Sequence, residues 1–242
     1  MSEDSKQSVL EHLQELRQRL IKSLIAVAIA SVIAFIFYQW LFYILMLPTE
    51  GLSLIYIEMT EMLGTIMKVC LVAGIILAMP YLVFQGIMFV SPALTPKEKK
   101  YVYIILPWIA LMFMGGVAFG YFVLVPPATR FLISFGADIA SPEIRVGNYI
   151  SVVARLLLAI GIVFEMPVIT TFLARLGVLK PHWLSRHRRV AIIFAFILAA
   201  IITPTFDPIN QSLVAIPLIV LYEMSIWLAK LFQKRQPSEE AT

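Results

Sequence analysis

Residues 63–88 read LGTIMKVCLVAGIILAMPYLVFQGIM, a run of 26 residues in which Lys68 carries the only charge. A helix of this length reaches about 39 Å, more than the roughly 30 Å of a bilayer's hydrocarbon core. Three further runs, 24–45, 102–125 and 149–174, are also long and apolar enough to cross. Continuous apolar runs favour helices over a transmembrane barrel, whose strands alternate. The sequence therefore predicts an all-α, polytopic membrane protein.

Two shorter apolar runs follow, 190–203 and 213–229, with 14 and 17 residues. As straight helices they would reach only about 21 and 26 Å. The turn-rich stretch TPTFDPINQ separates them, which is typical of a short helical hairpin. We therefore expect six transmembrane helices, the last two short, in a single membrane domain over 1–242. An amphipathic helix at 8–22 precedes the first span, and a tail follows at 231–242.

The composition excludes several classes of protein. Apolar residues make up 60% of the chain and charged residues only 14%, against about a quarter charged in soluble domains. One cysteine, Cys70, permits neither an intramolecular disulfide nor a cysteine cluster, and His182 and His187 lack acidic partners. No nucleotide-binding or hydrolase motif occurs. We expect no metal, no cofactor, no nucleic acid and no enzymatic activity.

Basic residues divide unequally between the alternate loops. The N-terminal segment, the loops near 89–101 and 175–189 and the tail contain 15 of the 19 Lys and Arg. The other loops contain only Arg130 and Arg145, while Lys68 and Arg155 lie within spans. Positive charge concentrates on the cytoplasmic side, so both termini are predicted to be cytoplasmic. The polar N-terminus does not resemble a cleavable signal peptide.

The outer segments 46–62 and 126–148 are longer than the other outer loop. Pro126 and Pro127 are expected to end the third span, because proline lacks the amide donor that a helix needs. The following ATRFLISFG then predicts a short interfacial helix with Arg130 at the headgroups.

Ionisable groups inside spans are costly and need an explanation. Lys68 and Arg155 lie about six residues inside an outer end, from where their long side chains can reach the surface. Glu223 either lines a polar pocket in the membrane or is paired structurally near the cytoplasmic interface, where Lys230 follows seven residues later.

Glu165 is too deep for its short side chain to reach either surface, and Pro167 predicts a helix kink beside it. Either the acid is satisfied by a neighbouring helix and is purely structural, or it lines a polar pocket that opens to the cytoplasm. The residues alone leave both readings open.

Two carboxylates stand out on the basic cytoplasmic face. SVLEHLQELRQRLIKSL at 8–24 describes an amphipathic helix in which Glu15 and Arg19 form an i, i+4 pair. In FVSPALTPKEKK, Thr95, Pro96 and Glu98 form a capping box that predicts a helix beginning at Pro96. Glu98 is then either a helix cap alone or, together with Glu15, an acidic site that selects a placed cation by geometry.

Five motifs occur in a characteristic order: HLQELRQRL, Pro48, FVSPALTPKEKK, FEMP and ITPTFDPINQSLVAIPLIVLYE. Together, over about residues 8 to 230, they resemble TatC, the core receptor subunit of the twin-arginine protein translocase. The resemblance implies a receptor that binds twin-arginine signal peptides of folded proteins at the cytoplasmic face. It also implies single-span partners of the TatA and TatB types, a homo-oligomer within the complex, and export driven by the proton-motive force across a bacterial inner membrane rather than a thylakoid.

The resemblance also implies roles for particular residues. The signal-peptide site matches Glu15, Arg17, Phe89 and Glu98, and the acid of the membrane pocket matches Glu165. Pro48 and Asp207 match outer-side positions where substitutions matter. The turn TPTFDP is one residue longer than the family's usual TPPDP, so the role of Asp207 is open.

Two other functions are compatible with the residues alone. A proton-coupled small-solute transporter would use Glu165 as its relay, but it predicts repeat symmetry that the sequence lacks. A structural scaffold for single-span partners would use Glu98 only as a helix cap.

Overall fold

The structure, a computed structural model, describes residues 3–49, 54–90, 96–134, 143–203 and 207–232, and only the backbone of 3–11, 90, 96–100 and 132. Within these ranges the chain is helical, and the one β-type pairing is an isolated bridge between Ile55 and Arg145. In chain order the helices are α1 (Glu3–Ile36), α2 (Tyr38–Met46), η1 (Leu47–Thr49), α3 (Glu61–Val90), α4 (Pro96–Phe119), η3 (Gly120–Leu124), α5 (Val125–Ser134), α6 (Val146–Phe164), α7 (Met166–Arg175), α8 (Pro181–Arg186), α9 (Arg188–Ile202) and α10 (Pro208–Phe232).

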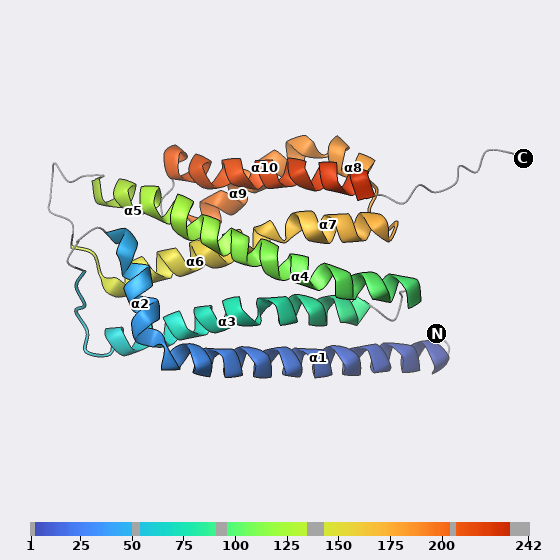
Figure 1. Cartoon of the computed structure of the whole chain (residues 1–242), viewed down its shortest axis with the longest axis horizontal. Coiled ribbons are helices and arrows are strands. Elements are labelled where there is room, and N and C mark those ends of the chain that lie inside the picture. The colour runs from blue at the N-terminus through green and yellow to red at the C-terminus, as the bar shows by residue number, and fades with distance from the viewer. Residues whose placement is uncertain (1–2, 50–53, 91–95, 135–142, 204–206, 233–242) are drawn as a thin grey trace, which may run out of the picture.

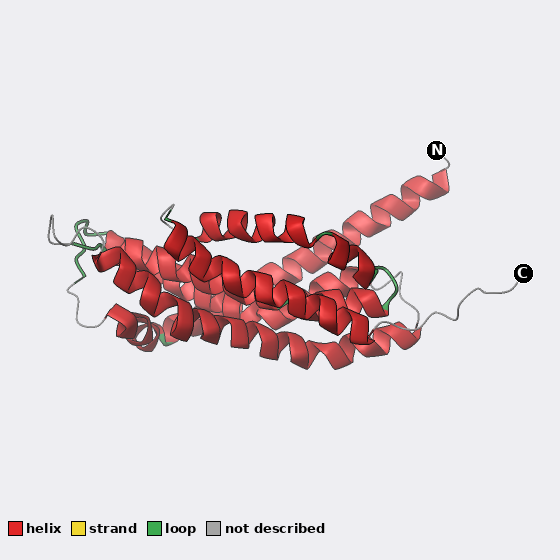
Figure 2. Cartoon of the chain, turned by 90° about the horizontal axis from the view of Figure 1, so that it is seen from above, coloured by secondary structure: helices red, strands yellow, loops and turns green. Residues whose placement is uncertain are grey.

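The long helices lie side by side along one axis (Figure 1). Helix α1 packs on α3, α3 packs on α4 and α6, and α10 packs on α7 and α9. The N-terminal part of α1 leaves the bundle at an angle (Figure 2). The N-terminus therefore lies at one end of the bundle, and the turn regions before α3 and α6 lie at the opposite end, which we call the far end.

Five helical segments are long and apolar enough to cross a membrane: His12–Ile36, Glu61–Phe89, Tyr101–Phe131, Val146–Arg175 and Pro208–Phe232. The last is longer than predicted. Helix α10 has 25 residues because it already begins at Pro208 and takes up Asn210 and Gln211, so the expectation of two short final spans was wrong for the second. Helix α9 has 15 residues, or about 22 Å, and remains short as expected.

The predicted end of the third span at Pro126 and Pro127 was also wrong. The helix changes to π-type pairing over Gly120–Leu124 and then continues to Ser134. Both prolines follow directly after this segment, where the shifted pairing accommodates the missing amide donors. The stretch expected to form a separate interfacial helix is thus the end of a continuous one.

The first span contains a break that the sequence did not indicate. Helix α1 runs through 8–22 without interruption and ends at Ile36, and α2 restarts after Phe37. Two tyrosines hold α2 in place: the hydroxyl of Tyr121 donates to the carbonyl of Ile44 at 2.6 Å, and that of Tyr149 donates to Leu45 at 2.8 Å. The carbonyl of Ile44 also accepts the backbone N–H of Leu47, so the two tyrosine bonds tie the last turn of α2 to the rest of the bundle.

The core is centred on α6, where Ile150, Leu156 and Ile160 are buried. Close helix contacts depend on small residues, as is usual in membranes. A Cβ atom on Gly74 of α3 would lie 2.7 Å from the backbone nitrogen of Ser31 in α1. The backbones of α1 and α3 therefore touch at this point, which fixes how the two helices align along their length.

Candidate functional site

A hydrogen-bonded network joins α1 to α3 near the N-terminal end of the bundle. Nε of Arg19 donates to Oε1 of Glu15 at 3.0 Å, and Nη2 of Arg19 donates to the same oxygen. Nη1 of Arg19 donates to Oε1 of Gln85 at 3.2 Å, and Nε2 of Gln85 donates to the hydroxyl of Tyr81 at 2.6 Å. Gln85 is buried, so the network holds the partly exposed Glu15 carboxylate against α3.

An aromatic stack lies next to this network. The rings of His12 and Phe89 are 4.3 Å apart, with 24° between their planes. His12 is three residues before Glu15, and Phe89 is four residues after Gln85, so each lies one helical turn from a network member. Two predicted site residues, Glu15 and Phe89, are thereby brought to the same α1–α3 seam.

The other two predicted members of this site, Arg17 and Glu98, are not among the described side chains of the α1–α3 seam. Arg17 is exposed, and its position two residues after Glu15 turns it away from the seam. Glu98 lies in the first turn of α4, which begins at Pro96 as predicted. Its side chain lies outside the described residues, as do Thr95 and the rest of the link 91–95.

Sequence reasoning missed His12, Tyr81 and Gln85. Gln85 offered a signal, because it is a polar amide within the apolar run 63–88. His12 offered none, since its stacking partner comes from another helix. Arg19 was identified as an ion-pair partner of Glu15, which the structure confirms.

A cavity of about 400 Å³ lies between α4, α7 and α10. The guanidinium carbon of Arg175 lies 3.9 Å from the ring centre of Tyr101 at its rim. Trp108, Pro167 and Phe172 line its interior. Tyr101 is three residues after Glu98, so the cavity begins one turn of α4 beyond that acid.

Glu165 interrupts the fourth span where Pro167 predicted a kink. Helix α6 ends at Phe164, α7 begins at Met166, and Glu165 forms the turn between them. Its side chain is 1% exposed, and neither carboxyl oxygen has a hydrogen-bond partner among the described residues. Satisfaction by a neighbouring helix, one of the two readings that the sequence left open, is therefore absent from that part of the chain.

Two other acidic residues, Glu223 within α10 and Asp207 before it, have partners. Oε1 of Glu223 lies 2.9 Å from Nε of Arg188 in α9, whereas Lys230 was the expected partner. Asp207 caps α10: its Oδ1 accepts the backbone N–H of Asn210 at 2.7 Å, and its Oδ2 accepts the Asn210 side chain at 3.0 Å. Pro48 lies half-buried in η1 at the far end, and Thr205 and Phe206 of the long turn lie outside the described residues.

Comparison with known proteins gives a consistent result. The family model for the Sec-independent protein translocase protein (TatC) matches residues 11–217. The TatC of Carboxydothermus hydrogenoformans is 40% identical over 240 residues, covering 98% of this chain and 99% of that protein. The TatC of Aquifex aeolicus is 41% identical over 232 residues, covering 93% and 96%.

A solved structure, described as the crystal structure of the twin-arginine translocase receptor TatC, superposes with a TM-score of 0.81. It is 42% identical, and the match covers 91% of this chain and 99% of that one. Sequence and fold therefore agree over nearly the whole length: the chain belongs to the TatC family, the membrane components of the Sec-independent twin-arginine protein translocase.

Proposed function

We propose that this protein is the receptor that binds the paired arginines of a signal peptide where the N-terminal parts of α1 and α4 meet the C-terminal end of α3. The observation that carries the proposal is that the Glu15 carboxylate already binds a guanidinium, that of Arg19. Nε and Nη2 of Arg19 both donate to Oε1 of Glu15, and Oε2 of Glu15 accepts no hydrogen bond from the described side chains. An incoming arginine can donate to the Oε2 of Glu15. Alternatively, it can replace Arg19 on Glu15, and Arg19 then keeps its hydrogen bond to Gln85.

Arginine suits this site better than lysine does. Its planar fork donates two parallel hydrogen bonds to a carboxylate, whereas an ammonium acts as a point charge. Glu98 would receive the second arginine from the start of α4, and Phe89 would offer an aromatic face to a guanidinium. The apolar stretch of the signal would then follow the cavity that begins at Tyr101.

Binding of a labelled twin-arginine peptide to the purified protein in detergent tests this proposal. Glu15→Gln and Glu98→Gln should each weaken binding, since each variant keeps its shape and loses its charge. Glu143→Gln is the matched control, because Glu143 is exposed at the far end. Equal binding by a folded Glu98→Gln variant would remove Glu98 from the site, and indifference to Arg→Lys in the peptide would refute the receptor role.

We further propose that all six apolar segments cross, with α9 as the short fifth span and both termini in the cytoplasm. The imbalance of 15 basic residues against two supports this orientation. Cys70 is buried, so single cysteines can be labelled without removing it. A cysteine at position 2 should react only from the cytoplasm and one at position 143 only from outside; the reverse pattern would invert the topology.

Partners of the TatA and TatB types, and further copies of this chain, are proposed to complete the complex in a bacterial inner membrane. The Glu165 carboxyl is buried and has no hydrogen-bond partner among the side chains that the structure describes, which supports a polar intramembrane pocket because such a group favours a donor from an incoming helix. The similarities place the chain in a translocase family rather than an enzyme family, and they give no support to a small-solute transporter.

A further inference from the structure

Two cationic side chains meet at one serine inside the spans. Nζ of Lys68 in α3 donates to the hydroxyl of Ser151 in α6 at 2.6 Å. Nε of Arg155 donates to the backbone carbonyl of Ser151 at 3.1 Å. Both cationic side chains are exposed on the surface of the bundle. A lysine and an arginine from different helices thus form a cluster, which we call the Lys68–Arg155 pair.

No carboxylate neutralises this pair among the described side chains. Glu61, on the same helix as Lys68, lies seven residues away, or about 10 Å along the axis. Its carboxylate accepts the backbone N–H of Ile57 at 3.0 Å and so binds the segment that leads into α3. Two cations at this depth favour an anion from outside the chain, because hydrocarbon does not solvate them.

The depth of the pair matches that of a lipid headgroup beside α9. The segment Val146–Arg175 has 30 residues, about 45 Å, which exceeds the hydrocarbon core by about 15 Å, or about 7 Å at each end. Arg155, about 14 Å along it, then lies about 6 Å inside the core. Helix α9 is about 8 Å too short to span the core, so lipid headgroups beside it would sink by about 4 Å at each end, which brings those at the far end close to the level of Arg155.

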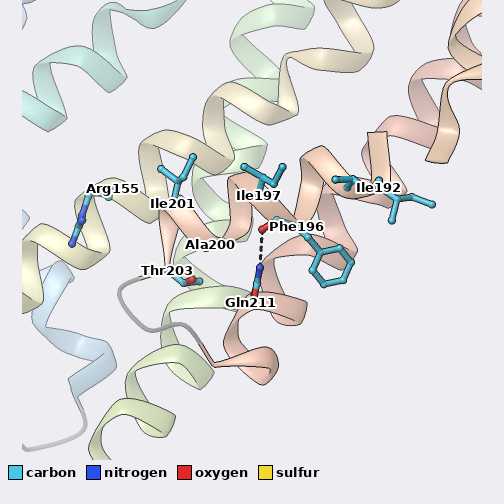
Figure 3. Close-up of a pocket in the computed structure, with 9 residues that line it drawn as sticks. Arg155, Ile192, Phe196, Ile197, Ala200, Ile201, Thr203 and Gln211 are labelled. Atoms are coloured by element: carbon cyan, nitrogen blue, oxygen red, sulfur yellow. Dashed lines mark hydrogen bonds between the residues drawn. The ribbon is translucent and has the colours of Figure 1, made fainter. Parts of the chain in front are cut away.

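An apolar groove of about 780 Å³ runs from Arg155 along α9. Figure 3 shows Arg155 at one end of a row formed by Ile201, Ile197 and Ile192. Ile201 and Ile197 are exposed, and the row from 192 to 201 extends about 14 Å. Thr203, which follows the end of α9, lines the same groove, so the end of α9 and Arg155 lie at one level.

We propose that this surface binds an anionic phospholipid in the leaflet at the far end, with its phosphate on the Lys68–Arg155 pair and one acyl chain along α9. The groove alone would accept any alkyl chain. The two unneutralised cations add a preference for a phosphodiester, which the arginine fork can bind through two oxygens. Charge and shape therefore point to the same occupant.

Native mass spectrometry of the full chain in detergent, titrated with dioleoyl phosphatidylglycerol, tests the proposal. The wild type should retain the lipid, and the double variant Lys68→Gln/Arg155→Gln should bind at least tenfold more weakly. Diacylglycerol with the same chains lacks the phosphate and should bind both proteins equally. The charge-preserving exchange Lys68→Arg/Arg155→Lys should bind as the wild type does, which separates loss of charge from loss of folding.

Arg145→Gln is the matched control, because Arg145 is a second exposed basic residue of the far end and lies outside the groove. Equal retention of phosphatidylglycerol by the wild type and the double Gln variant would overturn the proposal. Displacement of the lipid by glycerol 3-phosphate at equal concentration would also overturn it, since the site would then bind a free anion. So would a crosslink in membranes from position 201 to another polypeptide with no lipid retained.

Discussion

Replacing Gly74 with alanine should separate α1 from α3 and weaken the proposed signal site about 16 Å away, at Gln85. The added methyl would lie 2.7 Å from the nitrogen and 2.8 Å from the Cα of Ser31, both backbone atoms that cannot rotate aside. Ordinary contact begins at about 3.4 Å, so the helices must part by about 0.7 Å. Such overpacking costs about 1–3 kcal/mol.

Gly86 of the same helix supplies the control, since a Cβ there would meet nothing within 4 Å. Gly86→Ala should gain up to about 1 kcal/mol from the higher helix propensity of alanine. The thermal unfolding midpoint in detergent should therefore be lower for Gly74→Ala than for Gly86→Ala. Binding of a twin-arginine peptide should also weaken only for Gly74→Ala, because the Glu15 network spans the two helices.

Equal midpoints and equal peptide binding for the two alanine variants would refute the reasoning. They would mean that the backbones of α1 and α3 do not touch at Gly74 in the membrane. A lower midpoint of Gly74→Ala with unchanged peptide binding would mean that the helices touch at Gly74 but that this contact does not influence the proposed site.

Three further substitutions test other parts of the structure. Gln85→Leu removes the buried acceptor that holds Arg19, so peptide binding, followed by fluorescence anisotropy, should fall about 2- to 10-fold; unchanged affinity would exclude Gln85 from positioning the site. Asp207→Ala should lower the stability of the folded protein by about 0.5–2 kcal/mol while Asp207→Asn largely retains it, because only alanine loses the cap on Asn210; thermal unfolding distinguishes them. Glu165→Met removes a buried carboxyl that has no hydrogen-bond partner in the described ranges, so it should raise the free energy of unfolding of the isolated protein by about 1–3 kcal/mol, seen as a higher thermal midpoint, while an export assay in cells shows loss of transport; a lower midpoint would mean that the carboxyl is satisfied.

Local signals in the sequence predicted several features of the fold. Pro96 begins α4, and Pro167 marks the break at Glu165, because proline restricts the backbone wherever it occurs. Pro126 and Pro127 misled the same reasoning. The π-type segment before them, which packs against α6, has no pattern in the sequence that we used to predict it.

The break at Phe37 and the start of α10 show a similar limit. No proline, glycine or charge marks Phe37, and the carbonyls of α2 are held by tyrosines 77 and 104 residues away. Asn210 and Gln211 read as turn residues, yet the cap from Asp207 and a bond from Gln211 to the carbonyl of Phe196 draw them into the helix. Contacts distant in sequence therefore hold α2, whereas the start of α10 depends on a cap only three residues away and on the bond from Gln211 to Phe196.

The candidate site divides in the same way. Glu15 and its pairing with Arg19 followed from spacing within one helix. The contributions of Gln85 and His12 required knowing that α1 lies on α3, since each contacts a residue of the other helix.

Helix α1 differs from the other spans in how little of it the protein covers. In its most apolar stretch 6% of residues are buried, against 44% in the span built from α6 and α7. Lipid therefore contacts most of the surface of α1, while the Gly74–Ser31 contact fixes its alignment with α3. Since Glu15 lies on α1 and Phe89 on α3, a change in membrane thickness would shift the two side chains together and leave their mutual alignment unchanged.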